Sequence, residues 1–384
     1  MDKLKEFDID TTRSNVLKAM SGISKPSDET KFKSSSTSYR GIPFDNYYLV
    51  FLMMVDLLEY DYFGPAEKVN YIISFEFEGV RCSVAQQKFG MRLWCGEEQN
   101  GEAIYKIIQK GIKAAKPYFL WRAEQASSSS ELNLESKCPQ LWEKYEYLRE
   151  ESGRLLNNFE KDKDKAVVEE GETEKGWKYT STTYPAYEFL KQGKWVHEAA
   201  IDAFFAWCEQ ALVHMAILQG KLTNGQDIVK LLKGDFGQKC KLVLDLTIPD
   251  EKAAYDDILS LRNELRNYVA HGSFGKDGAA FSFHTATGAI PLRVLGKKTR
   301  SEFAFGSADR RDWESDYNRI EAFLETLWAN GRGPAEQFLK TGYPSVLTYA
   351  VDGTYEKAMV NVGAMEDFLF HLGRMIDNAA NMDF

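Results

Sequence analysis

Apolar residues recur along most of the chain at three- and four-residue spacing, which is the period of a helix with one buried face. This spacing predicts helices over residues 44–62, 101–125, 141–159, 187–220, 224–232, 236–246, 249–272, 308–330 and 363–380. The pattern over 187–220 is the longest, and its apolar face is broad. We therefore expect this helix to lie at the centre of a helical bundle.

Alternating apolar and polar residues predict strands in three other places. Within 69–95 the alternation surrounds Glu78-Gly79 and predicts a β-hairpin or a three-stranded meander. A short hairpin is expected within 274–294, and another over 346–360, where Asp352-Gly353 is typical of a two-residue hairpin turn. Helices and antiparallel strands in separate blocks give α+β as the predicted fold class.

A charged segment suggests where the domains divide. Residues 160–178 are almost wholly charged, and such a segment buries too little apolar surface to order itself. We therefore predict an N-terminal α+β domain over 1–160 and a charged linker or insertion over 161–183. A helical bundle over 184–280 follows, with four antiparallel helices in series joined by short connections. Residues 281–384 are expected to form a C-terminal α+β extension of hairpins and helices that packs on the bundle.

Composition narrows the class of protein. The 384 residues are 44% hydrophobic and 13% aromatic, which is enough for folded cores. The five cysteines are scattered, and no two have the spacing of a zinc or redox pair, so we expect a cytoplasmic protein without a metal or cofactor. No signal peptide and no uncharged apolar run of 18 residues is found, so no membrane span is expected.

The charge is unevenly distributed along the chain. A net charge of -9 argues against a protein that coats nucleic acid without specificity. Residues 181–300 nevertheless hold 15 Lys and Arg against 13 Asp and Glu, whereas the segments on either side are acidic. The excess of two positive charges fits a local site for a polyanion inside an acidic protein.

The end of the helix over 249–272 concentrates the candidate chemistry. Its core-facing stripe consists of Ile258, Leu261, Leu265, Tyr268 and Val269. On the opposite, exposed face stand Arg266, Asn267 and His271. Gly272 ends a helix readily, so His271 falls in the last turn, where the helix dipole favours a protonated imidazole. A permanent cation and a titratable base therefore share one face.

The run Arg266-Asn267-Tyr268-Val269-Ala270-His271 resembles the R-x4-6-H signature of the HEPN superfamily, including the polar residue after the arginine. The resemblance covers residues 187–272. It implies a small helical bundle that acts as a homodimer and, as in many members, a metal-independent endoribonuclease of the toxin or anti-phage defence type. Some HEPN toxins carry a modifiable tyrosine two residues beyond the histidine; Ser273 stands there in this chain, so that regulation is not expected.

RNA supplies its own nucleophile for such a reaction, because the 2′-hydroxyl can attack the adjacent phosphorus. His271 is expected to transfer the proton, since an imidazole exists in both forms near neutral pH. Arg266 is expected to stabilise the charge on the five-coordinate phosphorus, with two donors for its oxygens. By resemblance, Asn267 orients the histidine or the phosphate, and the pairs of two protomers meet across the dimer cleft.

Four further residues are expected to bind substrate or support the site. Arg262 shares a face with Arg266 and either binds a flanking phosphate or forms an ion pair with Asp257 or Glu264. Exposed cations that would bind RNA are Lys239 and Lys241. Glu209, on the apolar helix, either supports Arg266 or makes a structural hydrogen bond. Three histidines are expected to be structural or exposed, namely His197, His284 and His371.

Two main functions remain open at this point, besides a third in which the long acidic C-terminal portion is an adaptor surface. The first is a cytoplasmic endoribonuclease with RNA as substrate, a homodimeric Arg/His site and an antitoxin or other regulatory protein as partner. The second is a non-catalytic HEPN protein that binds RNA, a nucleotide or a protein. They differ in whether two copies of Arg266 and His271 meet in one basic cleft.

Overall fold

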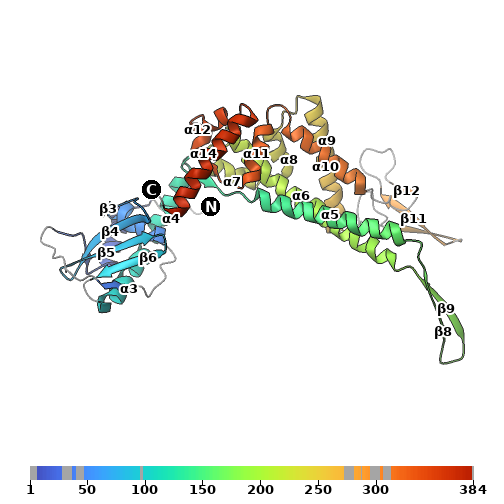
Figure 1. Ribbon diagram of the computed structural model, residues 1–384, viewed down its shortest axis with the longest axis horizontal. Helices are drawn as coiled ribbons and strands as arrows, with labels where there is room; N and C mark the ends of the chain where they lie inside the picture. The colour runs from blue at the N-terminus through green and yellow to red at the C-terminus, as the bar shows by residue number, and fades with distance from the viewer. Residues whose placement is uncertain are drawn as a thin grey trace. The chain divides into compact units, whose positions relative to one another are not determined.

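The computed structural model of the protein describes residues 7–27, 37–39, 47–95, 98–271, 281–286, 288–294, 303–305 and 313–382 (Figure 1). For residues 37–39, 98–99, 266–271, 293–294 and 304 it describes the backbone alone. The fold is mixed α+β, with long helices and small antiparallel sheets, as the sequence predicted. The chain divides into two compact units, residues 1–129 with 368–384 and residues 130–367.

The first unit is a sheet with helices on its buried face. Its elements are α1 (Ile9–Ala19), β1 (Ile23–Ser24), β2 (Thr37–Tyr39), α2 (Tyr47–Phe51), the π-helix η1 (Leu52–Leu57), β3 (Tyr62–Phe63), β4 (Val69–Phe77), β5 (Val80–Gln87), β6 (Gly90–Cys95), α3 (Glu98–Ala114) and α4 (Lys116–Ser127). The strands pair in the order β1-β4-β5-β6-β2, with β3 also on β4, and every pairing is antiparallel.

The sheet forms because β4 alternates buried and partly exposed side chains, which gives it one core face. Tyr71, Ile73 and Phe75 are buried on that face and belong to the same core cluster as side chains of α1, η1 and α3. The β4–β5 turn is made by Glu78 and Gly79, whose φ angles of 52° and 74° suit a tight hairpin turn. The predicted meander is therefore confirmed.

The predicted helix over 101–125 is formed as two helices. The break falls at Ala115, directly before Lys116 and Pro117 at the start of α4. Proline has no amide hydrogen to donate, and its ring clashes with a carbonyl of the preceding turn. The apolar period continues across the break, which is why the sequence pattern predicted one helix.

The second unit is largely helical. Its elements are β7 (Asn133–Leu134), α5 (Cys138–Asp162), β8 (Val167–Glu172), β9 (Lys178–Thr183), α6 (Ala186–Leu218), α7 (Gly225–Leu232), α8 (Phe236–Val243), α9 (Pro249–His271), β10 (Phe281–Thr285), β11 (Gly288–Val294), β12 (Phe303–Phe305), α10 (Trp313–Trp328), α11 (Gly333–Thr341), β13 (Ser345–Val346), α12 (Leu347–Val351), α13 (Thr354–Ala358) and the start of α14 (Val362–Asn381). The helices predicted over 187–220, 224–232, 236–246 and 249–272 are confirmed as α6 to α9.

Helix α6 is the centre of this unit. Almost every side chain in its second half is buried, including Phe204, Leu212 and Met215. Helix α5 runs antiparallel along α6, while α8, α9 and α11 also pack on α6 and α10 packs along α9 (Figure 1). Among the described residues α6 alone is long and apolar enough to cross a membrane, and 78% of its most apolar window is buried inside the protein.

The charged segment after α5, expected to be a linker or an insertion, is an ordered insertion between α5 and α6 and not a linker between domains. It forms the two-stranded hairpin β8–β9, paired from Val167 with Thr183 to Glu172 with Lys178 (Figure 1). Backbone pairing orders a segment whose side chains are nearly all exposed, and composition carries no signal of that pairing. Because α5 packs along α6, both belong to one unit, and the units divide at Ser129–Ser130 and not at residue 160.

The hairpin predicted over 346–360 is wrong. Gly353 does adopt a left-handed conformation, with φ of 82°, but α12 and α13 flank it in place of strands. Leu347 and Tyr355 are buried on the inner faces of these two short helices. Val346 does lie in a strand, but its partner is Asn133 in β7.

The two ends of the chain belong to the same compact unit. Helix α14 begins in the second unit, and its residues from Phe368 onward belong to the first. There the amide of Lys68 donates to the carbonyl oxygen of Met382 at 2.7 Å, and the amine of Lys88 donates to Oδ1 of Asn381 at 3.1 Å. The C-terminal segment is therefore part of the N-terminal unit, which the predicted division into consecutive domains did not include.

Candidate functional site

Helix α9 carries the predicted Arg/His motif, and its backbone is helical through His271. Its predicted core face is confirmed where side chains are described, because Ile258, Leu261 and Leu265 are buried. The side chains of Tyr268 and Val269, and those of the predicted catalytic residues Arg266, Asn267 and His271, lie outside the described part of the protein. The described geometry of the site is therefore the set of contacts that hold α9 up to Leu265.

The first turn of α9 is held by a buried ion pair. Glu251 accepts from Nη2 of Arg332 at 2.9 Å and from the side-chain amide of Asn330, and its other oxygen accepts from the amide of Asp245 at 2.7 Å. Burial by itself would raise the pKa of Glu251, but the hydrogen bonds from Arg332 and Asn330 outweigh it and lower the pKa. The carboxylate therefore stays charged and fixes α9 to the loop between α10 and α11.

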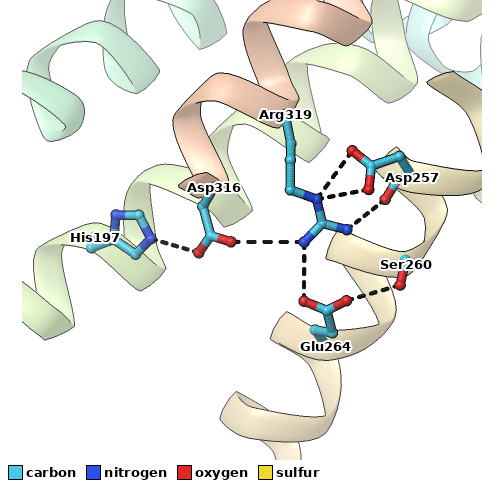
Figure 2. Close-up of polar contacts among 6 residues, drawn as sticks. All are labelled: His197, Asp257, Ser260, Glu264, Asp316 and Arg319. Carbon is cyan, nitrogen blue, oxygen red and sulfur yellow. Dashed lines mark hydrogen bonds and ion pairs between the residues drawn. The ribbon is translucent and has the colours of Figure 1, made fainter. Parts of the chain in front are cut away.

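The middle of α9 is held by one arginine of α10 (Figure 2). Nε of Arg319 lies 3.0 Å and 3.1 Å from the two carboxylate oxygens of Asp257, and its Nη2 donates to the Asp257 carbonyl at 2.8 Å. Nη1 of Arg319 donates to Glu264 at 3.1 Å, and Ser260 donates to the other oxygen of Glu264 at 2.8 Å. A single guanidinium thus spans two turns of α9 and ends two residues before Arg266.

A buried histidine lies behind this arginine. Nε2 of His197 on α6 is 3.0 Å from a carboxylate oxygen of Asp316 on α10, and the other oxygen of Asp316 lies 3.9 Å from Nη1 of Arg319 (Figure 2). The imidazole is fully buried, with the rings of Trp313 and Tyr317 edge-on at 4.6 Å and 4.8 Å. His197 is structural, one of the two roles expected for it, and it links α6 through α10 to α9.

A third cluster joins α9 to α6 and α8 one turn before Arg266. Glu209 on α6 accepts hydrogen bonds from Arg262 on α9 and from the amine of Lys239 on α8. The Arg262 guanidinium also lies over the rings of Phe236, at 4.7 Å, and Phe205, at 5.7 Å. The Glu209 carboxylate therefore joins α6 to one cation of α9 and one of α8.

This cluster corrects two expectations about charged residues. Lys239 was expected to be exposed, but only 3% of it is accessible because its amine turns inward to Glu209. Arg262 pairs with Glu209 and not with Asp257 or Glu264, which are bound by Arg319. Glu209 therefore makes structural ion pairs with Lys239 and Arg262. The exposed amine of Lys241 lies 5.9 Å from the ring of Tyr255, and its binding of RNA stays a prediction.

Among the other titratable side chains, two features bear on the site's chemistry. Within the described ranges, no group of three or more His, Cys, Asp or Glu side chains is placed to hold a metal ion. His214, buried on α6, has its Nδ1 2.7 Å from the hydroxyl of Ser345, and burial lowers its pKa to about 4. This histidine is therefore neutral at pH 7 and serves the packing of β13 on α6.

The sequence did not predict the contacts that join His197, Asp316 and Arg319, because His197 is far from the other two residues in the chain. The signal available was the polar His197 on an apolar helix, since a buried imidazole needs a partner. Nothing in the sequence says that the partner is Asp316, 119 residues later. Comparison with protein-family models, curated proteins and solved structures returned no match for this chain.

Proposed function

We propose that the protein is a cytoplasmic, metal-independent endoribonuclease of the toxin or anti-phage defence type, built on a HEPN-like bundle and acting as a homodimer. In this proposal RNA is the substrate, and an antitoxin or other regulatory protein is a partner. Arg266 and His271 are the catalytic residues, and Asn267 orients them. The observation that carries the proposal is that the Arg266–His271 run continues helix α9 directly beyond its anchored portion.

The anchors matter because a catalytic group must be held within about 0.5 Å of its working position. Helix α9 is tied at its first turn by Arg332, and over residues 257–264 by Arg319 and, through Arg262, by Glu209. These three partners come from three different helices or loops of one compact unit. A base and a cation at the end of so firmly held a helix are well suited to catalysis.

The chemistry follows from the residue types. The neutral imidazole of His271 accepts the proton of the 2′-hydroxyl as that oxygen attacks phosphorus. The Arg266 guanidinium donates two hydrogen bonds to the non-bridging oxygens as their charge grows. A second, protonated His271 from the other protomer gives its proton to the departing 5′-oxygen. The products are a 2′,3′-cyclic phosphate and a free 5′-hydroxyl, and no metal takes part.

One observation favours the second candidate function, a non-catalytic HEPN protein that binds RNA, a nucleotide or a protein. Arg262 and Lys239 were both expected to bind substrate phosphates, and both are engaged by Glu209. Fewer cations are then left around Arg266 to hold a long polyanion. Within this second function, the loss of these cations favours a nucleotide or a protein over an RNA strand, because a nucleotide presents few phosphates and a protein presents none.

The test compares the purified wild type with His271→Ala and Arg266→Ala on total RNA in the presence of a chelator. We expect the wild type to cleave and each variant to lose at least about a hundredfold in rate, which is the usual contribution of a proton-transfer or charge-stabilising group. His284→Ala is the matched control, because His284 is an exposed histidine on β10. Equal cleavage by all four proteins would remove these residues from the mechanism, and no cleavage by any of them would leave the binding function.

A further inference from the structure

The small sheet that follows α9 in the chain has one face made mainly of large apolar side chains. Strands β10, β11 and β12 pair antiparallel, with Phe281 opposite Leu292 and Leu292 opposite Phe305, while Phe283 is opposite Ile290. Paired residues lie on the same side of a sheet, and so do residues two apart in one strand. One face therefore carries Phe281, Phe283, Ile290, Leu292, Phe303 and Phe305, which we call the phenylalanine face.

This face is exposed although its side chains pack against one another. The rings of Phe283 and Phe305 approach to 5.8 Å across the central strand, and those of Phe281 and Phe303 to 6.5 Å. Even so, the four phenylalanines remain 49–65% accessible and Ile290 39%. A three-stranded sheet is stable when its apolar face is covered, so exposure of this extent indicates a missing partner.

The composition of the phenylalanine face decides which class of partner fits. The one described polar side chain on this side of the sheet is Thr285, at the end of β10, and its hydroxyl donates to the carbonyl oxygen of Gly288 at 2.7 Å; the reverse face carries Ser282 and His284. A platform for single-stranded nucleic acid combines aromatic rings with cations and hydrogen-bond donors. A face of phenylalanine, isoleucine and leucine is complementary to another apolar face, and a second copy of the chain provides one.

The area is sufficient for such a pairing. At roughly 200 Å² for a large side chain, the accessible parts of these residues amount to about 500 Å² per copy. Two copies facing each other would bury about 1,000 Å², the lower limit for a specific interface. Two sheets packed face to face lie about 10 Å apart and interdigitate their side chains, which suits a two-fold arrangement.

We propose that the phenylalanine face is the surface through which two copies of this protein associate. The proposal stands on the sheet alone. Its consequence for the Arg/His site rests on the proposed function, because Phe281 follows His271 by ten residues in the chain and a shared sheet would tether the ends of two α9 helices near one axis.

The first test measures oligomeric state by sedimentation velocity over a wide range of protein concentration, without RNA. We expect the wild type to be dimeric. Phe283→Ser/Phe305→Ser should raise the dimer dissociation constant at least about a hundredfold, because each substitution is present in both copies and so acts twice in a symmetric interface. Phe63→Ser/Phe89→Ser is the matched control, since both of these phenylalanines are more than 60% accessible and lie in the other unit. Circular dichroism should show that all variants keep the wild-type helical signal.

The second test locates the interface directly. All five native cysteines are buried, so a cysteine placed at Phe305 reacts selectively with a bis-maleimide cross-linker. We expect Phe305→Cys to give a covalent dimer on a denaturing gel and Thr182→Cys, on the exposed hairpin β8–β9, to give monomer.

A wild type that stays monomeric at every concentration would overturn the proposal, as would a dimer that Phe283→Ser/Phe305→Ser leaves intact. If the wild type is monomeric and this double variant instead weakens the binding of a fluorescent single-stranded RNA, the face is an RNA platform and the proposal is also overturned. Because oligomeric state is measured without substrate, a dimer through this face that fails to cleave RNA would leave this proposal standing and overturn the nuclease. A dimer that cleaves RNA and survives Phe283→Ser/Phe305→Ser would overturn this proposal alone.

Discussion

In the second unit, several contacts between helices are ion pairs that centre on one carboxylate, as at Glu209. The sequence predicted correctly that Glu209, on an apolar helix, needs a partner. It could not choose that partner, because Lys239, Arg262 and Arg266 all lie on neighbouring helices and their distances depend on packing. The same limit applies to Lys239, whose charge suggested exposure although its position in α8 turns it inward. Residue types predict what a site needs, whereas packing decides which atoms meet.

Removal of Glu209 is expected to destabilise the protein. Glu209→Ala leaves the buried amine of Lys239 without its carboxylate, and an unpaired buried charge costs about 2–3 kcal/mol when its partner was partly exposed. Urea unfolding followed by tryptophan fluorescence measures the loss. Glu209→Ala/Lys239→Met should recover part of it, and a double variant as unstable as the single one would show that Lys239 is not the reason.

His214 should make stability depend on pH. Its pKa of about 4 in the folded protein lies below the unfolded value near 6.5, so the unfolded chain binds more protons between these values. The stability from this histidine is fully present above about pH 6.5 and falls by about 3 kcal/mol as pH drops toward 4. The measurement is the difference in unfolding free energy between wild type and His214→Gln from pH 7 to pH 4. Parallel curves for the two proteins would contradict the assignment.

At the scale of elements, the helices were predictable because their apolar residues recur at helical spacing, and α6 and α9 are the clearest examples. The hairpin predicted over 346–360 failed because Asp352-Gly353 is compatible with a turn between helices as well as between strands. Hairpin β8–β9 was missed because its side chains are exposed on both faces, so no period-two pattern of burial exists to be read. The anchoring of α9 by α10 involves charged residues, whose pairing has no periodic signal.

The anchor on α10 predicts a local effect on α9. Arg319→Met removes the guanidinium that spans Asp257 and Glu264, and it should cost about 1 kcal/mol, because those carboxylates are about half exposed. Amide hydrogen exchange should rise over residues 257–265 of α9 and stay unchanged in the buried half of α6. Arg154→Met is the control, since Arg154 forms an exposed ion pair within α5. Equal exchange in both variants would deny Arg319 this role.

If the proposed nuclease is correct, the same variant separates positioning from binding. Arg319 pairs with carboxylates of α9 and α10 and has no free donor assigned to RNA, so Arg319→Met should lower kcat and leave KM unchanged. A rise in KM alone would indicate that Arg319 contacts the substrate.

At the scale of the whole molecule, the predicted domain boundary lies at the most highly charged segment of the chain. The segment of highest charge density proved to be a hairpin within one unit, whereas the actual division falls in the serine-rich stretch at residues 127–130. In the sequence that stretch falls between the helices predicted over 101–125 and 141–159. The membership of residues 368–384 in the first unit depends on contacts over three hundred residues of separation, such as Lys68 with Met382.

That shared membership of both chain ends sets an order of events during synthesis. The residues of β4, β5 and β6 leave the ribosome early, but the segment that caps Lys68 and Lys88 is translated after α9 and α10 are already outside. Helix α9 can thus be complete while the unit that contains β4, β5 and β6 still lacks this later segment. A chain that ends at residue 367 would contain helix α9 with its anchors Arg332, Arg319 and Glu209 but would lack the segment that binds Lys68 and Lys88.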